Sequence, residues 1–233
     1  MVVKVGHRGA AGHEPENTLR SFRRAMELGV DMVELDVHLC GSGELVVIHD
    51  ETVDRTTDGT GEVAKMTFDE LRALDAGKGE GIPTLREVID LATGRMGINI
   101  ELKGLGTAEA ALEHIEDAVD KGWDRSGFQV SSFHLGELAA IRELSKDVRT
   151  GVLFVLDDGG IMEFAELNGA YSINPNHRTV TNDFVARAHE RGLKIFAWTV
   201  NEPEDIARMK GLGVDGIISD YPDRIDEAPG HPR

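Results

Sequence analysis

Short apolar stretches alternate with longer amphipathic stretches along most of this chain, and no other feature limits its fold as strongly. The apolar stretches have the length of strands, and the segments between them carry the helical spacing of apolar residues. The strand-like stretches cover residues 2–5, 32–37, 98–102, 128–133, 150–156, 171–176, 194–200 and 214–222. About eight strands in strand-helix order predict an α/β fold, the (β/α)8 or TIM barrel. A doubly wound open sheet is the alternative, but no G-x-G-x-x-G motif follows the first stretch.

The alternation is interrupted once, after the second strand, by an excursion of about residues 38–83. Its early part, GSGELVVIHD at 41–50, has the pattern of a hairpin, and the rest is rich in Gly, Thr and Asp. In a barrel such a connection lies on the C-terminal face, where substrates bind, so we expect it to form part of the pocket wall. A surface insertion with no role at the pocket is the alternative. The length of 233 residues suits one hydrophobic core, so residues 1–233 are expected to form a single domain.

Acidic residues outnumber basic ones, 42 to 25, which gives a formal net charge of −17. Such a charge repels nucleic acids and anionic membrane surfaces, so neither is expected as a partner. The single cysteine, Cys40, cannot form an intrachain disulfide, and no apolar segment reaches the roughly 20 residues that a membrane helix needs. We therefore expect a cytoplasmic protein without stable membrane association. The sequence does not indicate an oligomeric state.

Charged side chains occupy one face of two predicted strands. In MVELDV, Glu34 and Asp36 are two residues apart and share a face, while the apolar residues between them face the helices. In INIELKG the same spacing puts Glu101 and Lys103 on one face. Unpaired buried carboxylates are costly, and a divalent cation held by Glu34, Asp36 and Glu101 would neutralise them. All-oxygen ligation favours Mg²⁺ or Ca²⁺, with Mn²⁺ as a third candidate, whereas a structural ion-pair network with Lys103 is the alternative.

Two histidines, His7 and His49, each end a predicted strand. Imidazoles at such positions can take and give protons near neutral pH, so these two are the candidate catalytic residues. Arg8 and Lys103 beside a bound cation indicate an anionic ligand with oxygens to share, and phosphate fits that description. A surface salt bridge is the alternative role for Arg8.

A series of short motifs runs in order along nearly the whole chain. The motifs are HRG at 7–9, PENT at 15–18, ELDV at 34–37, VVIHD at 46–50, DRTTDGTG at 54–61, IPTL at 82–85, IELK at 100–103, WTVN at 198–201 and DGIISDYP at 215–222. Together they resemble the glycerophosphodiester phosphodiesterase family. One departure is Gly41-Ser42-Gly43, which stands at a turn where the family usually carries Lys-Asp-Gly.

The resemblance implies a metal-dependent phosphoric diester hydrolase. Its substrates would be glycerophosphodiesters such as glycerophosphocholine, cut into an alcohol and sn-glycerol 3-phosphate. By match to the family motifs, Glu34, Asp36 and Glu101 would bind the metal. His7 and His49 would form the acid-base pair. Which histidine is the base stays open, as does the choice between the glycerol 2-hydroxyl and water as the nucleophile.

The same match assigns the remaining side chains of the site. Arg8 and Lys103 would hold the phosphate, and Phe133 and Trp198 would line the glycerol or head-group side. Two other functions stay open. A lysophospholipase D-type hydrolase acting on lipids predicts an exposed apolar rim, and a catalytically silent barrel would bind phosphate or a polyol.

Overall fold

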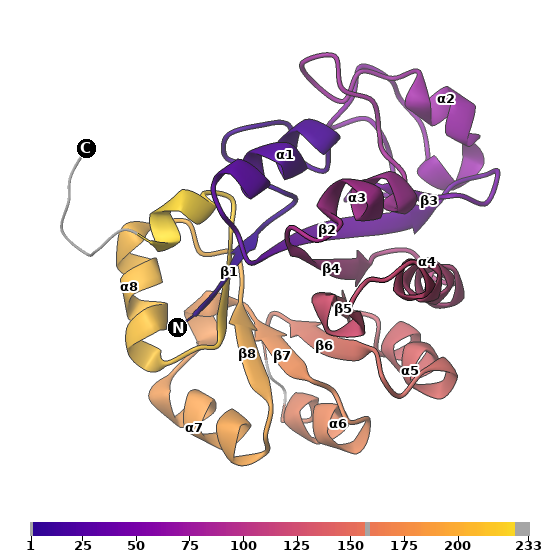
Figure 1. The fold of residues 1–233 in the computed structure, drawn as a ribbon. Coiled ribbons are helices and arrows are strands. Elements are labelled where there is room, and N and C mark those ends of the chain that lie inside the picture. The colour runs from indigo at the N-terminus through magenta and orange to yellow at the C-terminus, as the bar shows by residue number, and fades with distance from the viewer. Residues whose placement is uncertain (1, 157–158, 227–233) are drawn as a thin grey trace.

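The computed structural model describes residues 2–156 and 159–226, and its strands form one closed sheet (Figure 1). The strands are β1 (Val3–Gly6), β2 (Met32–Leu39), β3 (Leu45–Val47), β4 (Gly97–Leu102), β5 (Phe128–Ser132), β6 (Arg149–Phe154), β7 (Ser172–Pro175), β8 (Lys194–Ala197) and β9 (Gly216–Ser219). All except β3 run parallel, and the barrel closes because β1 pairs with both β2 and β9. The predicted TIM barrel is confirmed. The alternative of an open sheet is wrong, since β1 has no free edge.

Apart from α2 (Phe68–Arg72), which belongs to the excursion, the helices follow the parallel strands and surround the barrel (Figure 1). They are α1 (Leu19–Glu27), α3 (Leu85–Ala92), α4 (Ala108–Asp120), α5 (Leu135–Leu144), α6 (Ile161–Leu167), α7 (Asn182–Glu190) and α8 (Pro203–Leu212). Short 3₁₀ turns are η1 (Val63–Lys65), η2 (Arg125–Gly127), η3 (His177–Thr179) and η4 (Pro222–Ile225). In the described part of the chain, β9 is followed by η4 and not by a longer helix. None of the helices described is both long and apolar enough to span a membrane.

The alternation of side chains along β2 divides the core from the inside of the barrel. Its apolar residues pack in the main hydrophobic core together with Phe22 of α1 and Ile89 of α3. Glu34 and Asp36 lie on the opposite face, toward the barrel axis, and are almost completely buried. Asp36 is paired in register with Glu101 of β4. Two neighbouring strands thus deliver three carboxylates to the inside of the barrel.

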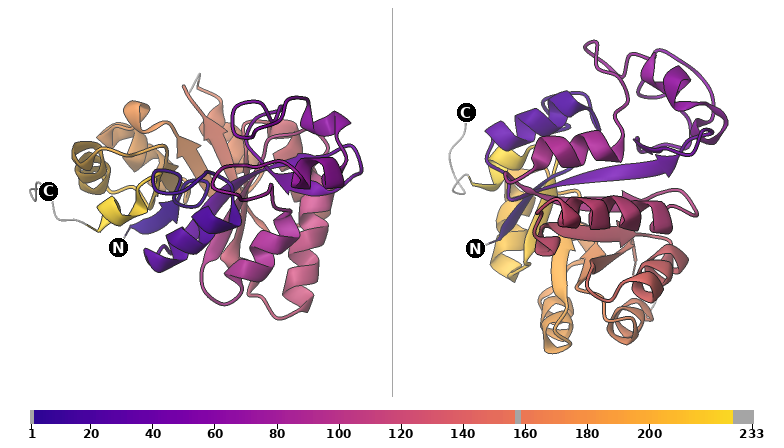
Figure 2. Two further views of the ribbon diagram at one scale, coloured as in Figure 1. Left: turned by 90° about the horizontal axis from the view of Figure 1, so that it is seen from above. Right: turned by 45° about the vertical axis from the view of Figure 1, so that its right-hand side comes forward.

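The excursion after β2 packs around a small hydrophobic cluster of its own. Strand β3 runs antiparallel to β2, and α2 begins with a capping box formed by Thr67 and Glu70. The buried apolar residues of the cluster are Cys40, Val46, Ile48, Val53, Val63, Leu71, Ala76 and Ile82. Figure 2 shows this segment standing out from the ring of helices on one side. It returns His49 to the end of the barrel, where this histidine lines a pocket.

Candidate active site

Eight of the nine side chains expected at the site line one pocket at the carboxyl ends of the strands. They are His7, Arg8, Glu34, His49, Glu101, Lys103, Phe133 and Trp198. The ninth, Asp36, lies beside the pocket within the carboxylate cluster. The polar floor also includes Asn99 and Ser131, which the sequence did not single out.

Glu34, Asp36 and Glu101 form a compact buried cluster. One oxygen atom from each carboxylate lies within 4.8 Å of the others. Glu34 Oε1 and Asp36 Oδ1 are buried and have no hydrogen-bond partner among the residues that the structure describes. Ion pairing with Lys103 therefore leaves two buried oxygens unsatisfied, contrary to what a purely structural network would give. The donor set and its unpartnered oxygens fit a hard divalent cation.

The cluster is electrostatically costly when it holds no cation. Burial and the charge of Asp36 raise the pKa of Glu34 to about 8. Burial and Asp36 also raise the pKa of Glu101 to about 7, against the lowering effect of Lys103. Near neutral pH the cation-free folded protein therefore holds protons on this cluster. A cation that binds there must displace them.

We expect a divalent cation to raise the melting temperature more at pH 8 than at pH 5. Folding raises the pKa values of Glu34 and Glu101, so without metal their contribution to stability is full below about pH 4.5 and is lost as the pH rises toward 7–8. The cation reverses this loss, and fewer protons compete with it at pH 8. At a concentration of about 100 times Kd, the increase at pH 8 should be roughly 5–10 °C. Thermal unfolding with and without Mg²⁺ or Ca²⁺ measures it, and equal shifts at both pH values would contradict the expectation.

A tight turn at Arg8 and Gly9 sets the orientation of the His7 and Arg8 side chains. Arg8 has a φ of 49° and Gly9 a φ of 87°, where a Cβ would lie 2.7 Å from the carbonyl carbon of Ser21. The Ser21 hydroxyl donates to the carbonyl oxygen of Arg8 at 2.8 Å and accepts from the N–H of Ala10 at 2.8 Å. The HRG motif and helix α1 therefore fix the backbone from which His7 and Arg8 reach the pocket.

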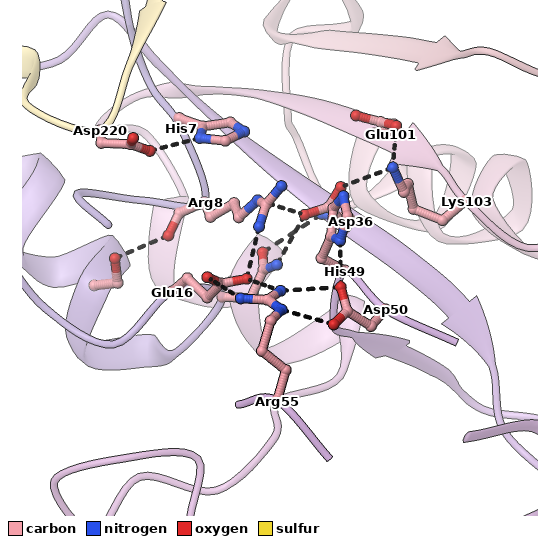
Figure 3. A network of polar contacts seen from close by, with 12 residues as sticks. His7, Arg8, Glu16, Asp36, His49, Asp50, Arg55, Glu101, Lys103 and Asp220 are labelled. Carbon is pink, nitrogen blue, oxygen red and sulfur yellow. Dashed lines mark hydrogen bonds and ion pairs between the residues drawn. The ribbon is translucent and has the colours of Figure 1, made fainter. Parts of the chain in front are cut away.

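A carboxylate holds each of the two histidines at Nδ1 (Figure 3). Nδ1 of His7 lies 2.6 Å from Oδ1 of Asp220, and Nδ1 of His49 lies 2.5 Å from Oδ1 of Asp50. Nε2 of His7 lies 3.9 Å from Oε2 of Glu34. A carboxylate at Nδ1 favours the tautomer that carries its proton there, which leaves Nε2 to exchange a proton with a ligand.

The environments of the two imidazoles shift their pKa values in opposite directions. Burial lowers the pKa of His7, but the hydrogen bond to Asp220 and the charge of Glu34 outweigh it, so that the pKa is raised. Burial lowers the pKa of His49, and the nearby carboxylates of Asp36 and Asp50 only partly oppose it. Two imidazoles with separated pKa values suit the two halves of an acid-base exchange.

Arg8 and Lys103 bring positive charge to the same pocket. Nη1 of Arg8 donates to Oε1 of Glu16 at 2.7 Å, and its Nε lies 3.2 Å from Oδ2 of Asp36 without forming a hydrogen bond. Nζ of Lys103 donates to Oε1 of Glu101 at 2.9 Å. The Arg8 side chain is only 16% exposed, so its ion pairs are not those of a surface salt bridge. Both cations keep donors for an anionic ligand beside the carboxylate cluster.

The sequence profile of the glycerophosphoryl diester phosphodiesterase family matches residues 7–224. The chain belongs to this family. The matched range contains both histidines, the carboxylate cluster and both cations described above.

Relatives in the family align along nearly the full length of the chain. A glycerophosphodiester phosphodiesterase of Caldanaerobacter subterraneus is 39% identical over an alignment of 236 positions that covers 95% of each chain. The solved glycerophosphodiester phosphodiesterase of Thermotoga maritima is 31% identical, covers 96% of each chain and superposes with a TM-score of 0.81. An Oleispira antarctica phosphodiesterase, solved with the product sn-glycerol-3-phosphate, is 31% identical with a TM-score of 0.88, and the match covers 95% of this chain and 94% of that one.

Two aromatic residues form one wall of this family member's pocket. Phe133 follows β5 and Trp198 follows β8, and their rings meet edge to face with centroids 5.5 Å apart. Nε1 of Trp198 donates to the carbonyl oxygen of Asn174 at 2.7 Å, which fixes the indole. Nζ of Lys103 lies 5.6 Å from the centroid of Phe133. The apolar wall therefore begins directly beside a cation that faces the carboxylate cluster.

Sequence reasoning missed the residues that orient this site. Asp50 and Asp220 hold the histidines, and Asn17 Nδ2 donates to Asp36 Oδ2 at 2.9 Å. Each of the three lies within a motif noted above. Asp50 directly follows His49, so its position in the sequence could have identified it, whereas Asn17 and Asp220 are distant in sequence from the side chains that they contact. Glu16, in the PENT motif, was also missed.

Proposed function

We propose that this chain hydrolyses glycerophosphodiesters, such as glycerophosphocholine, to an alcohol and sn-glycerol 3-phosphate with the help of a divalent cation. The observation that carries the proposal is the convergence, in one pocket, of three buried carboxylates, two oriented imidazoles and two cationic side chains. A silent phosphate-binding or polyol-binding barrel would not need two imidazoles each held by a carboxylate. Membership of the family supports the same reaction.

Glu34, Asp36 and Glu101 would hold the cation, and their oxygens suit Mg²⁺ or Ca²⁺, with Mn²⁺ as a third candidate. A bound cation supplies positive charge against the phosphodiester oxygens. Lys103 Nζ donates to Glu101 and so fixes the orientation of one of these carboxylates. The single cysteine, Cys40, fits a cytoplasmic location, which stays a prediction.

The other side chains of the pocket would bind the phosphate, transfer protons and exclude water. Arg8 and Lys103 would bind the phosphate and stabilise the charge that develops on its oxygens. One of His7 and His49 would remove the proton of the nucleophile through Nε2, and the other would protonate the leaving alkoxide. Phe133, with Trp198, would exclude water on the side of the glycerol or head group.

Arg8→Lys is expected to lower kcat/KM by roughly 10- to 100-fold. Lysine keeps the charge but offers a single ammonium, so it cannot bind Glu16 and a phosphate oxygen with the planar geometry of Arg8. Steady-state kinetics with glycerophosphocholine measures the change, and most of it should lie in KM. A variant with unchanged KM would show that Arg8 does not bind substrate.

An apolar rim on the same face favours a second candidate, the lysophospholipase D-type activity. Leu105 after β4, and Val155 and Leu156 after β6, are 75%, 53% and 74% exposed. They flank Phe133, which follows the strand between them and is itself 39% exposed. Apolar side chains exposed at a substrate-binding face can contact an acyl chain.

A substrate panel separates the two candidates. The protein would be given glycerophosphocholine, glycerophosphoethanolamine and lysophosphatidylcholine, and release of sn-glycerol 3-phosphate, free base and lysophosphatidic acid would be quantified. The proposed function predicts sn-glycerol 3-phosphate from the two water-soluble diesters at the higher kcat/KM. Turnover of lysophosphatidylcholine alone would replace it by the second candidate.

A further inference from the structure

Arg55 lies beside the pocket in the excursion, within the DRTTDGTG motif, and has no part in the chemistry described so far. Its guanidinium forms four hydrogen bonds to two carboxylates (Figure 3). Nε and Nη2 donate to Oδ2 and Oδ1 of Asp50 at 2.7 and 3.0 Å. Nη1 and Nη2 donate to Oε2 and Oε1 of Glu16 at 2.9 and 2.8 Å. Arg55 therefore binds both carboxylates in a bidentate manner.

Each of these carboxylates also contacts a side chain that reaches into the pocket. Oδ1 of Asp50 accepts from Nδ1 of His49 at 2.5 Å. Oε1 of Glu16 accepts from Nη1 of Arg8 at 2.7 Å. The guanidinium of Arg55 thus joins two hydrogen-bonded arms. One arm consists of Asp50 and His49, and the other consists of Glu16 and Arg8.

The positive charge of Arg55 is needed between the carboxylates of Asp50 and Glu16. Asp50 and Glu16 are bound side by side on the same group, and without Arg55 their negative charges would repel each other. Of the ion-pair partners described for it, Glu16 would then keep Arg8, and Arg8 is also drawn toward the buried Asp36, 3.2 Å away. Asp50 would keep only its neighbour His49 among the ion-pair partners described for it. Both arms would lose the group that fixes their geometry.

We propose that Arg55 is a positioning residue that fixes His49 through Asp50 and Arg8 through Glu16, and so sets the proton-transfer group and the phosphate-binding group relative to each other. The inference rests on the function proposed above. It also gives the excursion a role at the pocket, because this segment supplies both His49 and the group that orients it. Lysine cannot replace Arg55, since an ammonium cannot bind each of two carboxylates through a pair of hydrogen bonds as the two edges of the guanidinium do.

The test compares Arg55→Gln and Arg55→Lys with a matched control, Arg72→Gln. Arg72 also joins the excursion to the barrel through an ion pair with Glu87 of α3, and it is similarly half-exposed. Among the described residues, the side-chain partners of Glu87 are Arg72 and Thr84, and neither lines the pocket. We expect both Arg55 variants to lower kcat by roughly 10- to 100-fold and to raise KM, while Arg72→Gln leaves both within about twofold. If Arg55→Gln matches Arg72→Gln in both constants, Arg55 only anchors the excursion and the proposal fails.

A double-mutant cycle and chemical rescue test whether the loss of kcat in the Arg55 variants acts through Asp50 and His49. Combining Arg55→Gln with Asp50→Asn should lower kcat by less than the product of the two single losses, because both break the same arm to His49. Millimolar methylguanidine should restore part of the kcat of Arg55→Ala, whereas methylamine should not. Additive losses in the cycle would contradict the proposal.

A readout without substrate keeps this inference separate from the proposed function. In ¹H–¹⁵N spectra of the imidazoles, Arg55→Gln should shift or broaden the Nδ1 signal of His49, and Arg72→Gln should leave it in place. If the unaltered protein cleaves no glycerophosphodiester, the proposed function fails while the spectra still decide the role of Arg55. An unchanged His49 signal in Arg55→Gln would overturn the positioning role whatever the activity.

Discussion

Replacing Glu34 by glutamine is expected to lower kcat on the order of 1,000-fold, since stabilisation by a bound cation contributes several kcal/mol. The amide removes one of three anionic ligands while keeping nearly the same shape. The cluster that remains, Asp36 and Glu101, already pairs with Arg8 and Lys103, so too little negative charge is left to bind the cation tightly. Calorimetry with Mg²⁺ or Ca²⁺ should show weakened binding in the same variant.

The same substitution is expected to make the metal-free protein more stable. Burial and Asp36 raise the pKa of Glu34 to about 8, which shows that its charged form is costly in the folded state. A neutral amide avoids that cost, so Glu34→Gln should melt at a higher temperature than the metal-free parent at pH 8. Glu116→Gln on α4 is the matched control and should change neither kcat nor cation affinity, because the ion pair described for Glu116 is an outer one with Arg125. A Glu34→Gln variant that binds the cation normally and turns over substrate would remove Glu34 from the site.

His7→Ala and His49→Ala are each expected to lower kcat by roughly 100- to 10,000-fold without weakening cation binding. Each imidazole is fixed at Nδ1 by its own carboxylate, so removal of one leaves the other in place. His114→Ala, on the outside of α4, is the control and should leave kcat unchanged. Kinetics and calorimetry on the three variants separate loss of proton transfer from loss of the metal site.

A substrate with a good leaving group assigns the two roles. Glycerophospho-p-nitrophenol releases an anion that needs no protonation, so the variant lacking the general acid should regain most of its activity on this substrate, and the variant lacking the base should not. Equal losses for both variants on both substrates would contradict a division of labour between His7 and His49.

Regular periodicity explains why the barrel and the carboxylate cluster could be predicted. A strand has a side-chain repeat of two, so Glu34 and Asp36 had to share a face once the apolar residues of the strand were assigned to the helices. Lys103 follows from Glu101 by the same spacing. Parallel strands bring their carboxyl ends to one face, which is why strand-end residues such as His7 lie beside the cluster.

The contacts that orient the site depend on long-range packing and were not predictable in this way. Asp220 follows the last barrel strand, 213 residues from His7, and only closure of the barrel between β1 and β9 brings the two together. Arg55 reaches Glu16 because the excursion folds over its own hydrophobic cluster, and that segment has no simple periodicity. The short turn η4 after β9 likewise departs from the regular alternation of strands and helices.

The central claim is that a divalent cation on the carboxylate cluster acts with the two histidines to cleave glycerophosphodiesters. The most direct test measures release of sn-glycerol 3-phosphate from glycerophosphocholine by metal-stripped protein, before and after Mg²⁺, Ca²⁺ or Mn²⁺ is added back. The account predicts no turnover without metal, restoration by at least one of these ions, and no restoration in Glu34→Gln or His49→Ala. Turnover that survives metal removal, or that no ion restores on any glycerophosphodiester, would contradict it.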